Sequence, residues 1–440
     1  MKRARFLSLR LSLCLLLGVA GSAFGQILPP VQLPTVPGLP TDELNRTVND
    51  TLRAADPQQL REVRRLRIRQ LLRTNRAGLE TDPRGAPILR SEVVALSPSA
   101  AALEAARAEG FNVGRTRTLE GLDATIVVLQ APTGMSTRRA LQRLRQLDPG
   151  GIYDFNHVYL DSGAVAEGAA EAPVASSVTP MSPAKGARIG LIDGGVQRKH
   201  PVFRDVSINE HGCVGGGVPS THGTAVASLL VGHTEHFNGV AVGAELYSAD
   251  VYCGLATGGA VDAVADAFAW LARERVPVIN ISLVGPANGL LEQLIRLVTA
   301  RGHIVVAAVG NDGPGAPPLY PAAYPAVVAV TAVDARRRVL IEACRGKHVD
   351  FAAPGADMAA AGLNAEFALV RGTSFAAPIA AGLFARQLTQ IDRARADSVV
   401  AALTSQAVDL GVRGPDKVYG NGLLGDELRP SPNLAKVSAR

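Results

Sequence analysis

Three polar residues stand where an apolar core would not be expected to hold them, and their side-chain types could together carry out nucleophilic catalysis. Asp193 ends an apolar run and precedes two glycines, His222 opens an apolar stretch, and Ser374 opens a longer one. A serine hydroxyl is a weak nucleophile until a base removes its proton, and a neutral imidazole needs a carboxylate to fix its tautomer. Taken singly, each residue also has an ordinary structural interpretation: Asp193 as a helix-cap acceptor, His222 as a core histidine and Ser374 as an N-cap. Catalysis therefore depends on a fold that brings them together.

The elements around these residues predict an α/β domain over 187–425. Short apolar runs rich in β-branched residues alternate with helical stretches. The expected strands are 187–192, 245–251, 278–283, 303–309 and 327–333, and the expected helices are 258–275, 288–301 and 373–390. This pattern favours a parallel sheet with helices on both faces, whose ligand crevice lies beyond the carboxyl ends of the strands.

A separate α+β unit is predicted over 91–160. The expected strands are 91–96, 111–117, 123–130 and 152–160, and the expected helices are 99–109 and 136–147. The resulting order β-α-β-β-α-β is that of a ferredoxin-like unit, which by itself says nothing about function. Residues 161–186, rich in small residues, predict an exposed linker between the two units.

The N-terminal region predicts export rather than a further globular domain. Residues 1–25 combine basic residues, a short apolar stretch and a small-residue cleavage pattern, which is typical of a signal peptide; an N-terminal anchor helix is the alternative. Residues 26–90 begin as a Pro-rich tether and include a basic amphipathic helix over 58–73. We favour a solvated charged face for that helix over contact with a membrane. We therefore expect a secreted or periplasmic protein, with a polar tail over 426–440 that shows no anchor.

Composition excludes some classes of protein. The 440 residues are 47% hydrophobic and 19% charged, so the chain is not disordered throughout, and the absence of long apolar runs beyond residue 25 excludes a multi-span membrane protein. Residues 1–160 hold 22 Lys and Arg against 14 Asp and Glu, a balance of +8, and residues 161–440 hold 23 against 25, a balance of −2. The net charge of +6 is therefore entirely N-terminal. Because steering follows local charge, we expect no nucleic-acid partner for the C-terminal domain.

The three polar residues lie in segments that closely resemble the signature regions of the subtilisin-like serine peptidases. The His segment reads HGTAVAS from residue 222, the Ser segment reads GTSFAAP from residue 372, and the chain order Asp, His, Ser also agrees. The resemblance extends over about 187–425 and includes residues 238–241, 280–283, 308–311 and 351–355.

The resemblance implies a role for each site residue. Asp193 would orient the imidazole, His222 would act as general base and then acid, and Ser374 would be the nucleophile. Asn311 would supply the side-chain donor of the oxyanion hole, where loss of one donor costs about 10²–10³ in kcat. The substrate-binding residues would be Ser282, Leu283, Val284 and Gly285.

The resemblance also implies that residues 91–160 form an inhibitory propeptide, which assists folding and then blocks the cleft with its last strand. We expect self-cleavage between Tyr159 and Lys185, because that segment is the exposed small-residue linker. The predicted protein is a secreted serine endopeptidase that forms an acyl-enzyme on Ser374, acts on protein or peptide substrates and is inhibited by its own propeptide. Its activity should rise through about pH 6–7.5 as the histidine loses its proton. The alternatives are a non-catalytic peptide-binding relative with a closed cleft, and an esterase.

Two departures from the family pattern lead to further expectations. Val284 stands where the family usually has Gly at the edge of the P1 pocket, so we predict a preference for small P1 residues. Gly194 follows Asp193 where a small polar residue is more usual, so a local hydrogen bond is expected to be missing.

The cysteines and possible metal ligands leave alternatives open. Once the signal peptide is removed, Cys213, Cys253 and Cys344 remain. We favour a disulfide between Cys213 and Cys253, with three free thiols or a zinc site including His211 as alternatives. Structural calcium occurs in the family, but no calcium-binding loop is found in this sequence, so we assign no metal or other cofactor.

Overall fold

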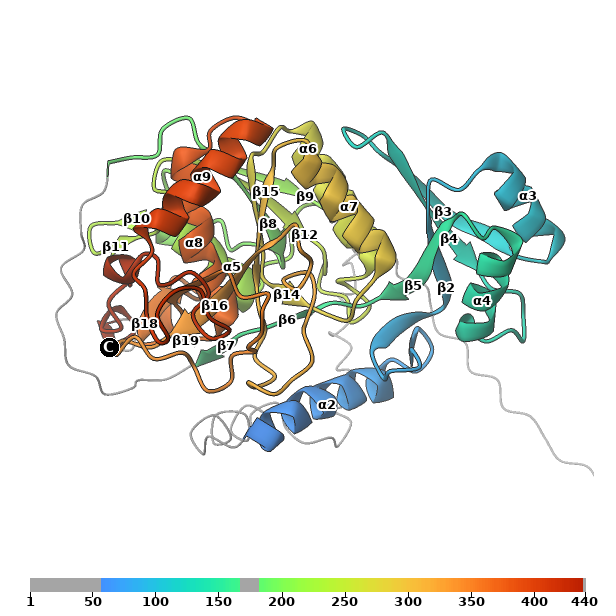
Figure 1. Ribbon diagram of the computed structural model, residues 1–440, viewed down its shortest axis with the longest axis horizontal. Helices are drawn as coiled ribbons and strands as arrows, with labels where there is room; N and C mark the ends of the chain where they lie inside the picture. The colour runs from blue at the N-terminus through green and yellow to red at the C-terminus, as the bar shows by residue number, and fades with distance from the viewer. Residues whose placement is uncertain (1–56, 167–181, 438–440) are drawn as a thin grey trace, which may run out of the picture. The chain divides into compact units, whose positions relative to one another are not determined.

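The computed structural model describes residues 57–166 and 182–437, and its larger domain is built on a seven-stranded sheet (Figure 1). In spatial order the strands are β17 (Phe351–Pro354), β16 (Val328–Val333), β15 (Ile304–Ala308), β13 (Val278–Ile281), β8 (Arg188–Asp193), β12 (Glu245–Asp250) and β9 (Ile208–His211). Every neighbouring pair is parallel. On one side of β8 the strands follow in chain order out to β17, and on the other side β12 lies between β8 and the edge strand β9. The order thus changes direction beside β8, which is the kind of switch point where crevices form at strand ends.

Helices cover both faces of this sheet, as the sequence predicts. One layer contains α5 (Thr221–Val231), α8 (Thr373–Gln387) and α9 (Arg393–Gln406), and the other contains α6 (Val261–Arg273) and α7 (Gly289–Ala300). Successive side chains of a strand point to opposite faces, so in β8 Ile189 and Leu191 join the first layer and Ile192 joins the second. Burial on both faces explains why the strands read as continuous apolar runs.

The second sheet is antiparallel and carries the order β-α-β-β-α-β. Its elements are β2 (Pro87–Leu96), α3 (Ala100–Ala108), β3 (Asn112–Leu119), β4 (Ala124–Gln130), α4 (Thr137–Leu147) and β5 (Ile152–His157), with β1 (Leu79–Thr81) added beside β2. Ser99 and Ser136 cap the two helices, and each hydroxyl accepts a bond from the backbone N–H three residues later. One face packs on α3 and α4, and side chains of the other join the core around α6 and α7.

Several further elements connect or border these two sheets. They are α2 (Pro57–Thr74), β6 (Leu160–Asp161), β7 (Ala164–Ala166), β10 (His233–Thr234), β11 (Phe237–Asn238), β14 (Leu283–Val284), β18 (Met358–Ala361), β19 (Phe367–Arg371), α10 (Leu434–Val437) and the 3₁₀ turns Pro201–Phe203 and Asp426–Leu428. β6 pairs antiparallel with β14, and β7 pairs antiparallel with β19. The chain that leaves the second sheet thus joins strands of the larger domain on both sides of residues 162 and 163.

A disulfide joins Cys213, in the loop before α5, to Cys253, just after β12, as we favoured. Closing a span of 40 residues stabilises the folded state by about 3–4 kcal/mol in the loop-entropy model. The bond leaves neither thiolate free for zinc, and His211 is hydrogen-bonded to Asp266 instead.

The predicted signal peptide, the tether before residue 57 and most of the linker lie outside the described residues. None of the described helices is long and apolar enough to cross a membrane.

Candidate active site

The carboxyl end of β8 and the first turn of α5 hold an aspartate and a histidine against each other. Asp193 is buried at the strand end, and α5 begins after Ser220, whose hydroxyl accepts a bond from the Gly223 N–H. His222 Nδ1 lies 2.9 Å from one Asp193 carboxylate oxygen and 3.0 Å from the other. The Gly194 N–H also donates to Asp193, at 2.7 Å, and a Cβ at Gly194 would lie 2.3 Å from the Ser220 hydroxyl oxygen. This bond comes from the backbone, which any residue but proline at 194 could supply, so it does not bear on the side-chain hydrogen bond that we expect to be missing here.

The electrostatic surroundings of His222 favour a basic imidazole. Burial by itself lowers the pKa of His222, but the Asp193 carboxylate, through charge and hydrogen bond, and the charge of Asp161 together raise that pKa above its ordinary value of 6.5. A carboxylate in this position also fixes the tautomer, because it accepts from Nδ1–H and leaves Nε2 available as a base.

Ser374 stands in the first turn of α8, and its hydroxyl faces a segment of the same chain. Ser374 Oγ and His222 Nε2 are both buried, and neither has a hydrogen-bond partner among the described residues. Ser374 Oγ lies so close to Gly163 that a Cβ there would come within 2.3 Å of it. Catalytic hydrogen bonds are often loose before the reacting groups are fully aligned, so an unformed bond between the two does not exclude a working pair.

Asn311 follows β15 and presents its amide to the same segment. Its Oδ1 accepts a bond from the Thr373 N–H at 3.1 Å, and its Nδ2 donates to the backbone carbonyl of Ser162. The Thr373 hydroxyl in turn accepts a bond from the Gly310 N–H at 3.1 Å. These contacts orient the amide so that its donor side faces the carbonyl that precedes Gly163.

The predicted substrate-binding residues contact the segment that runs through the site. Leu283 is paired with Asp161 and Val284 with Leu160, as β14 and β6 form a two-stranded antiparallel sheet. Just before β14, the Ser282 carbonyl accepts a weak bond from the Ser162 hydroxyl at 3.4 Å. All four predicted positions, 282–285, are buried, and Gly285 packs so closely on the Tyr159 ring that a Cβ there would lie 2.6 Å from it.

A tyrosine of the same segment is fully buried in the larger domain. The Tyr159 N–H donates to the Gly259 carbonyl at 2.8 Å, and its hydroxyl donates to the Pro286 carbonyl at 2.6 Å. The Tyr252 hydroxyl donates to the Tyr159 carbonyl at 3.0 Å. Sequence reasoning singled out neither Tyr252 nor Gly259, because only the tertiary fold brings them beside residues 159–163.

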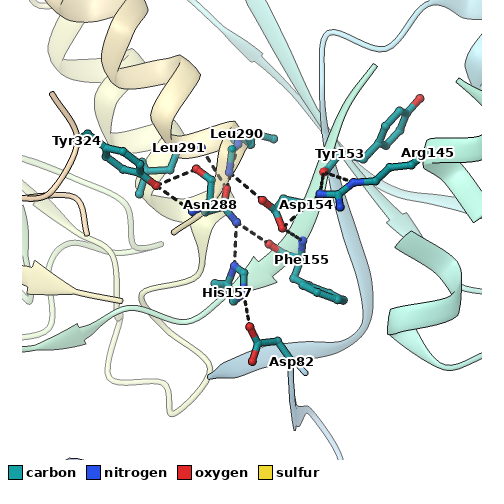
Figure 2. Close-up of polar contacts among 11 residues, drawn as sticks. Asp82, Arg145, Tyr153, Asp154, Phe155, His157, Asn288, Leu290, Leu291 and Tyr324 are labelled. Atoms are coloured by element: carbon teal, nitrogen blue, oxygen red, sulfur yellow. Dashed lines mark hydrogen bonds and ion pairs between the residues drawn. The ribbon is translucent and has the colours of Figure 1, made fainter. Parts of the chain in front are cut away.

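Strand β5 meets the N-terminus of α7 just upstream of this segment (Figure 2). Asn288 caps that helix, and its Nδ2 lies 2.9 Å from both the Phe155 carbonyl and Nδ1 of His157. The Asp154 carboxylate accepts from the Gly289 N–H at 2.8 Å. A carboxylate at this end of a helix is favoured by the free N–H groups and the helix dipole.

The N-terminus of α6 is also completed by the second sheet. Its N-cap residue, Ala260, has no side-chain acceptor, and the side-chain Oδ1 of Asn156 accepts from the Asp262 N–H at 3.3 Å. Arg115 bridges the buried carboxylates of Glu92 and Asp262, with distances of 2.7–3.1 Å. The contact between the two domains is therefore polar and specific as well as apolar.

Comparison of the sequence with known proteins finds one matching family model and several similar proteases. The model of the subtilase family (Peptidase_S8) matches residues 184–422. Subtilisin Savinase from Lederbergia lenta is 32% identical over 250 residues, which cover 55% of this chain and 90% of that protein. The minor extracellular protease Epr from Bacillus subtilis (strain 168) is 32% identical over 207 residues, which cover 46% of this chain and 32% of Epr.

Structural comparison indicates the same fold. Fervidolysin from Fervidobacterium pennivorans, described as a keratinolytic enzyme related to subtilisin, superimposes with a TM-score of 0.64 and 18% sequence identity. The match covers 78% of this chain and 61% of fervidolysin. The chain thus spans nearly all of Savinase but only about a third of Epr and less than two thirds of fervidolysin.

Proposed function

This chain belongs to the subtilase family of serine endopeptidases, and we propose that it is a secreted precursor that cuts its own backbone between Ser162 and Gly163. One observation carries this proposal: residues 159–166 lie in the site as an extended chain, with the Ser162 carbonyl at the Asn311 amide and Gly163 against the Ser374 hydroxyl. This bond falls within the linker window 159–185 expected from the sequence.

The proposed chemistry follows from the groups around that bond. Ser374 Oγ attacks the Ser162 carbonyl carbon while His222 Nε2 takes the hydroxyl proton, and Asn311 Nδ2 donates to the oxygen that becomes negative. The C–N bond then breaks, the Gly163 nitrogen leaves with the proton from His222, and an ester on Ser374 remains. Water hydrolyses the ester, with His222 again as base, and Ser162 leaves as a carboxylate. Asp193 stabilises the imidazolium in both steps.

The N-terminal part, up to Ser162, is proposed to act first as a folding template and then as an inhibitor. Its β5 residues complete the N-termini of α6 and α7, two helices whose first N–H groups would otherwise lack these acceptors. After the cut, β6 would stay paired with β14 and so would occupy the cleft that protein or peptide substrates must enter. The mature peptidase would then begin at Gly163.

Structural calcium is common among subtilases and is bound through oxygen ligands. Among the described residues, only Cys213, Asp250 and Cys253 come close enough together to hold a cation with three acidic, thiol or imidazole groups. The two sulfurs are bonded to each other, and the Asp250 carboxylate already accepts three backbone N–H bonds. Calcium prefers six to eight oxygen ligands, so this group does not fit it.

The size of the residue before the cut bond provides a test of the proposal. Ser162 is buried, with its hydroxyl bonded to the Ser282 carbonyl and its own carbonyl bonded to the oxyanion donor Asn311. We expect Ser162→Phe to slow self-cleavage by about 10- to 100-fold, since overpacking costs about 1–3 kcal/mol, and Ser162→Ala to cut as fast as the wild type. Intact mass against time measures the rate, and N-terminal sequencing should find Gly163 first in the mature fragment.

The same substitution at another serine of the linker serves as the control for that experiment. Ser182 is exposed and lies 20 residues downstream, so Ser182→Phe should leave both the rate and the cut site unchanged. A product that begins at a residue other than Gly163 in the wild type, or faster cutting of Ser162→Phe, would contradict the proposed bond and the preference for small P1 residues.

The pH dependence of self-cleavage should reflect the charges around His222. Because Asp193 and Asp161 raise the pKa of His222, its neutral form requires a higher pH than that of an ordinary histidine, so the rate should rise with pH through a midpoint above 6.5. Asp161→Asn removes a charge that raises this pKa and leaves the Arg67 charge that lowers it, so the midpoint should move to lower pH. Single-turnover rates between pH 5 and 8 for both proteins measure the shift. A rate that does not change over this range would rule out His222 as the base.

A further inference from the structure

Helix α2 contacts the same cleft through two arginines, outside the second sheet. Arg64 Nε lies 3.3 Å from an Asp312 carboxylate oxygen, and each of these two side chains is 17% exposed. The Arg64 guanidinium also donates to the Val284 carbonyl at 3.4 Å, and the Arg67 guanidinium is paired with the Asp161 carboxylate.

All three acceptors of these bonds border the proposed scissile bond. Asp312 follows the oxyanion donor Asn311, and Val284 belongs to the strand that pairs with β6. Asp161 is the residue before Ser162. Arg64 therefore bonds the edge of the cleft in the larger domain, and Arg67, from the same helix, bonds the segment that occupies the cleft.

The other arginines of this helix behave differently. Arg64 and Arg67 are three residues apart and so lie on one face of α2. Arg65 and Arg69 pair with Glu62 on the same helix, and their side chains are 70% and 49% exposed. The Arg67 side chain is itself 48% exposed, so the two pairs of arginines differ in their partners: Arg64 and Arg67 bond residues at the cleft, and Arg65 and Arg69 bond their own helix.

The charge of the bound segment increases when its backbone is cut. Burial by itself raises the pKa of Asp161, but the charge of Arg67 and smaller contributions from His222 and Arg64 lower it overall, so this carboxylate is ionised. Hydrolysis after Ser162 adds a second carboxylate directly beside it. Arg67 and this chain end belong to the same N-terminal fragment, so their attraction keeps α2 against the residues that fill the cleft, while Arg64 bonds the larger domain directly once the covalent link is lost.

We propose that α2 is a second inhibitory contact: Arg64 binds the edge of the cleft at Asp312 and Val284, Arg67 holds the cleft-bound Asp161, and the helix so retains the N-terminal segment after it has been cut. The inference rests on the proposed self-cleavage and adds a step to it. The cut enzyme stays inactive until α2 dissociates, so activity lags behind cleavage. α2 is joined to the second sheet through β1, so it leaves together with that sheet.

The test compares two double variants of the full-length chain that lose the same charge. Arg64→Ala/Arg67→Ala removes the arginines that bond residues at the cleft, and Arg65→Ala/Arg69→Ala is the matched control that removes the pair bonded to their own helix. Cleavage is followed by intact mass, and free enzyme by hydrolysis of a fluorogenic peptide over the same hours. We expect all three proteins to be cut, with a lag before activity in the wild type and the control, and about tenfold faster onset in Arg64→Ala/Arg67→Ala.

Two further measurements test the contact: the salt dependence of the lag, and hydrogen exchange in the Ser374→Ala variant, which is expected to stay uncut. Added salt should shorten the lag of the wild type and the control but not that of Arg64→Ala/Arg67→Ala. Equal lags in all three proteins would overturn the proposal. If no protein is cut, self-cleavage itself fails, and hydrogen exchange of residues 57–74 in Ser374→Ala then decides on α2 alone. Protection that is lost with Arg64→Ala/Arg67→Ala and kept in the control supports the contact, and equal exchange in all three refutes it.

Discussion

Ser374→Ala is expected to leave the full-length chain whole and without peptidase activity. The substitution removes the oxygen that faces Gly163 and leaves the Asp193–His222 pair and the Asn311 amide in place. Removing one member of such a triad lowers kcat by about 10⁴- to 10⁶-fold, because the remaining groups no longer have a nucleophile to activate. Intact mass and N-terminal sequence of wild type and variant, purified in parallel, measure self-cleavage, and a fluorogenic peptide measures the activity of any mature enzyme.

A serine away from the site provides the control for this experiment. Ser398 is exposed on α9 and bonds only the carbonyl one turn before it, so Ser398→Ala should be cut and should be active like the wild type. If the wild type also stays whole while folded, the non-catalytic peptide-binding relative becomes the better interpretation. Val284→Gly would then test whether the valine closes the cleft. If Ser374→Ala is itself cut at Gly163, another nucleophile or another protease performs the cleavage.

The central strands of the sheet could be predicted from the sequence, and its edges could not. β13, β15 and β16 are buried on both faces, so their residues are apolar except for Asn280 and Thr331 and stand out from the flanking loops. β9 and β17 lie at the two edges, with only four residues each, and β9 contains Asn, Glu and His. A short edge strand with polar residues has no period or composition that distinguishes it from a loop.

Where a segment contacts another domain, its local pattern was misleading. Residues 152–160 were expected to form one strand, but β5 ends at His157, and the next residues pair with the larger domain instead. The helix expected from residue 258 begins at Val261, because Gly258 and Gly259 form the loop against Tyr159. The sequence indicates that these residues are extended or flexible. Their structure, however, depends on contacts between Tyr159 and Gly259, which lie about 100 residues apart in the chain.

Some residues of the candidate site could be predicted from local motifs, and others could not. Asp193, His222 and Ser374 stand in local motifs with a recognisable wording, so the resemblance found them without knowledge of the fold. Ser162 and the two arginines of α2 belong to no such motif, and they matter only because the tertiary fold brings them to the cleft. A basic helix was predicted correctly, but no pattern in the sequence could say that one of its faces is turned toward Asp161 and Asp312.

Substitution of Asn311 is expected to cause the second large loss of activity, and two different substitutions distinguish its two hydrogen bonds. Nδ2 donates to the Ser162 carbonyl, and Oδ1 accepts from the Thr373 N–H. Asn311→Leu keeps the approximate size and removes both contacts. It should lower kcat for a peptide substrate by about 10²–10³ with little change in KM, because the donor acts chiefly on the negative charge that develops in the transition state.

Asn311→Asp decides whether the donor or the acceptor is responsible for that loss. An aspartate keeps an oxygen for the Thr373 N–H, but it brings a negative charge to the place where the substrate oxygen becomes negative. If Asn311 stabilises the oxyanion, Asn311→Asp should be at least as slow as Asn311→Leu, although its fold and unfolding midpoint match the wild type. If the role of Asn311 is only to hold the start of α8 through Thr373, Asn311→Asp should recover most of the activity. Steady-state kcat and KM of the three mature enzymes, each first shown to be cut at Gly163, distinguish these results.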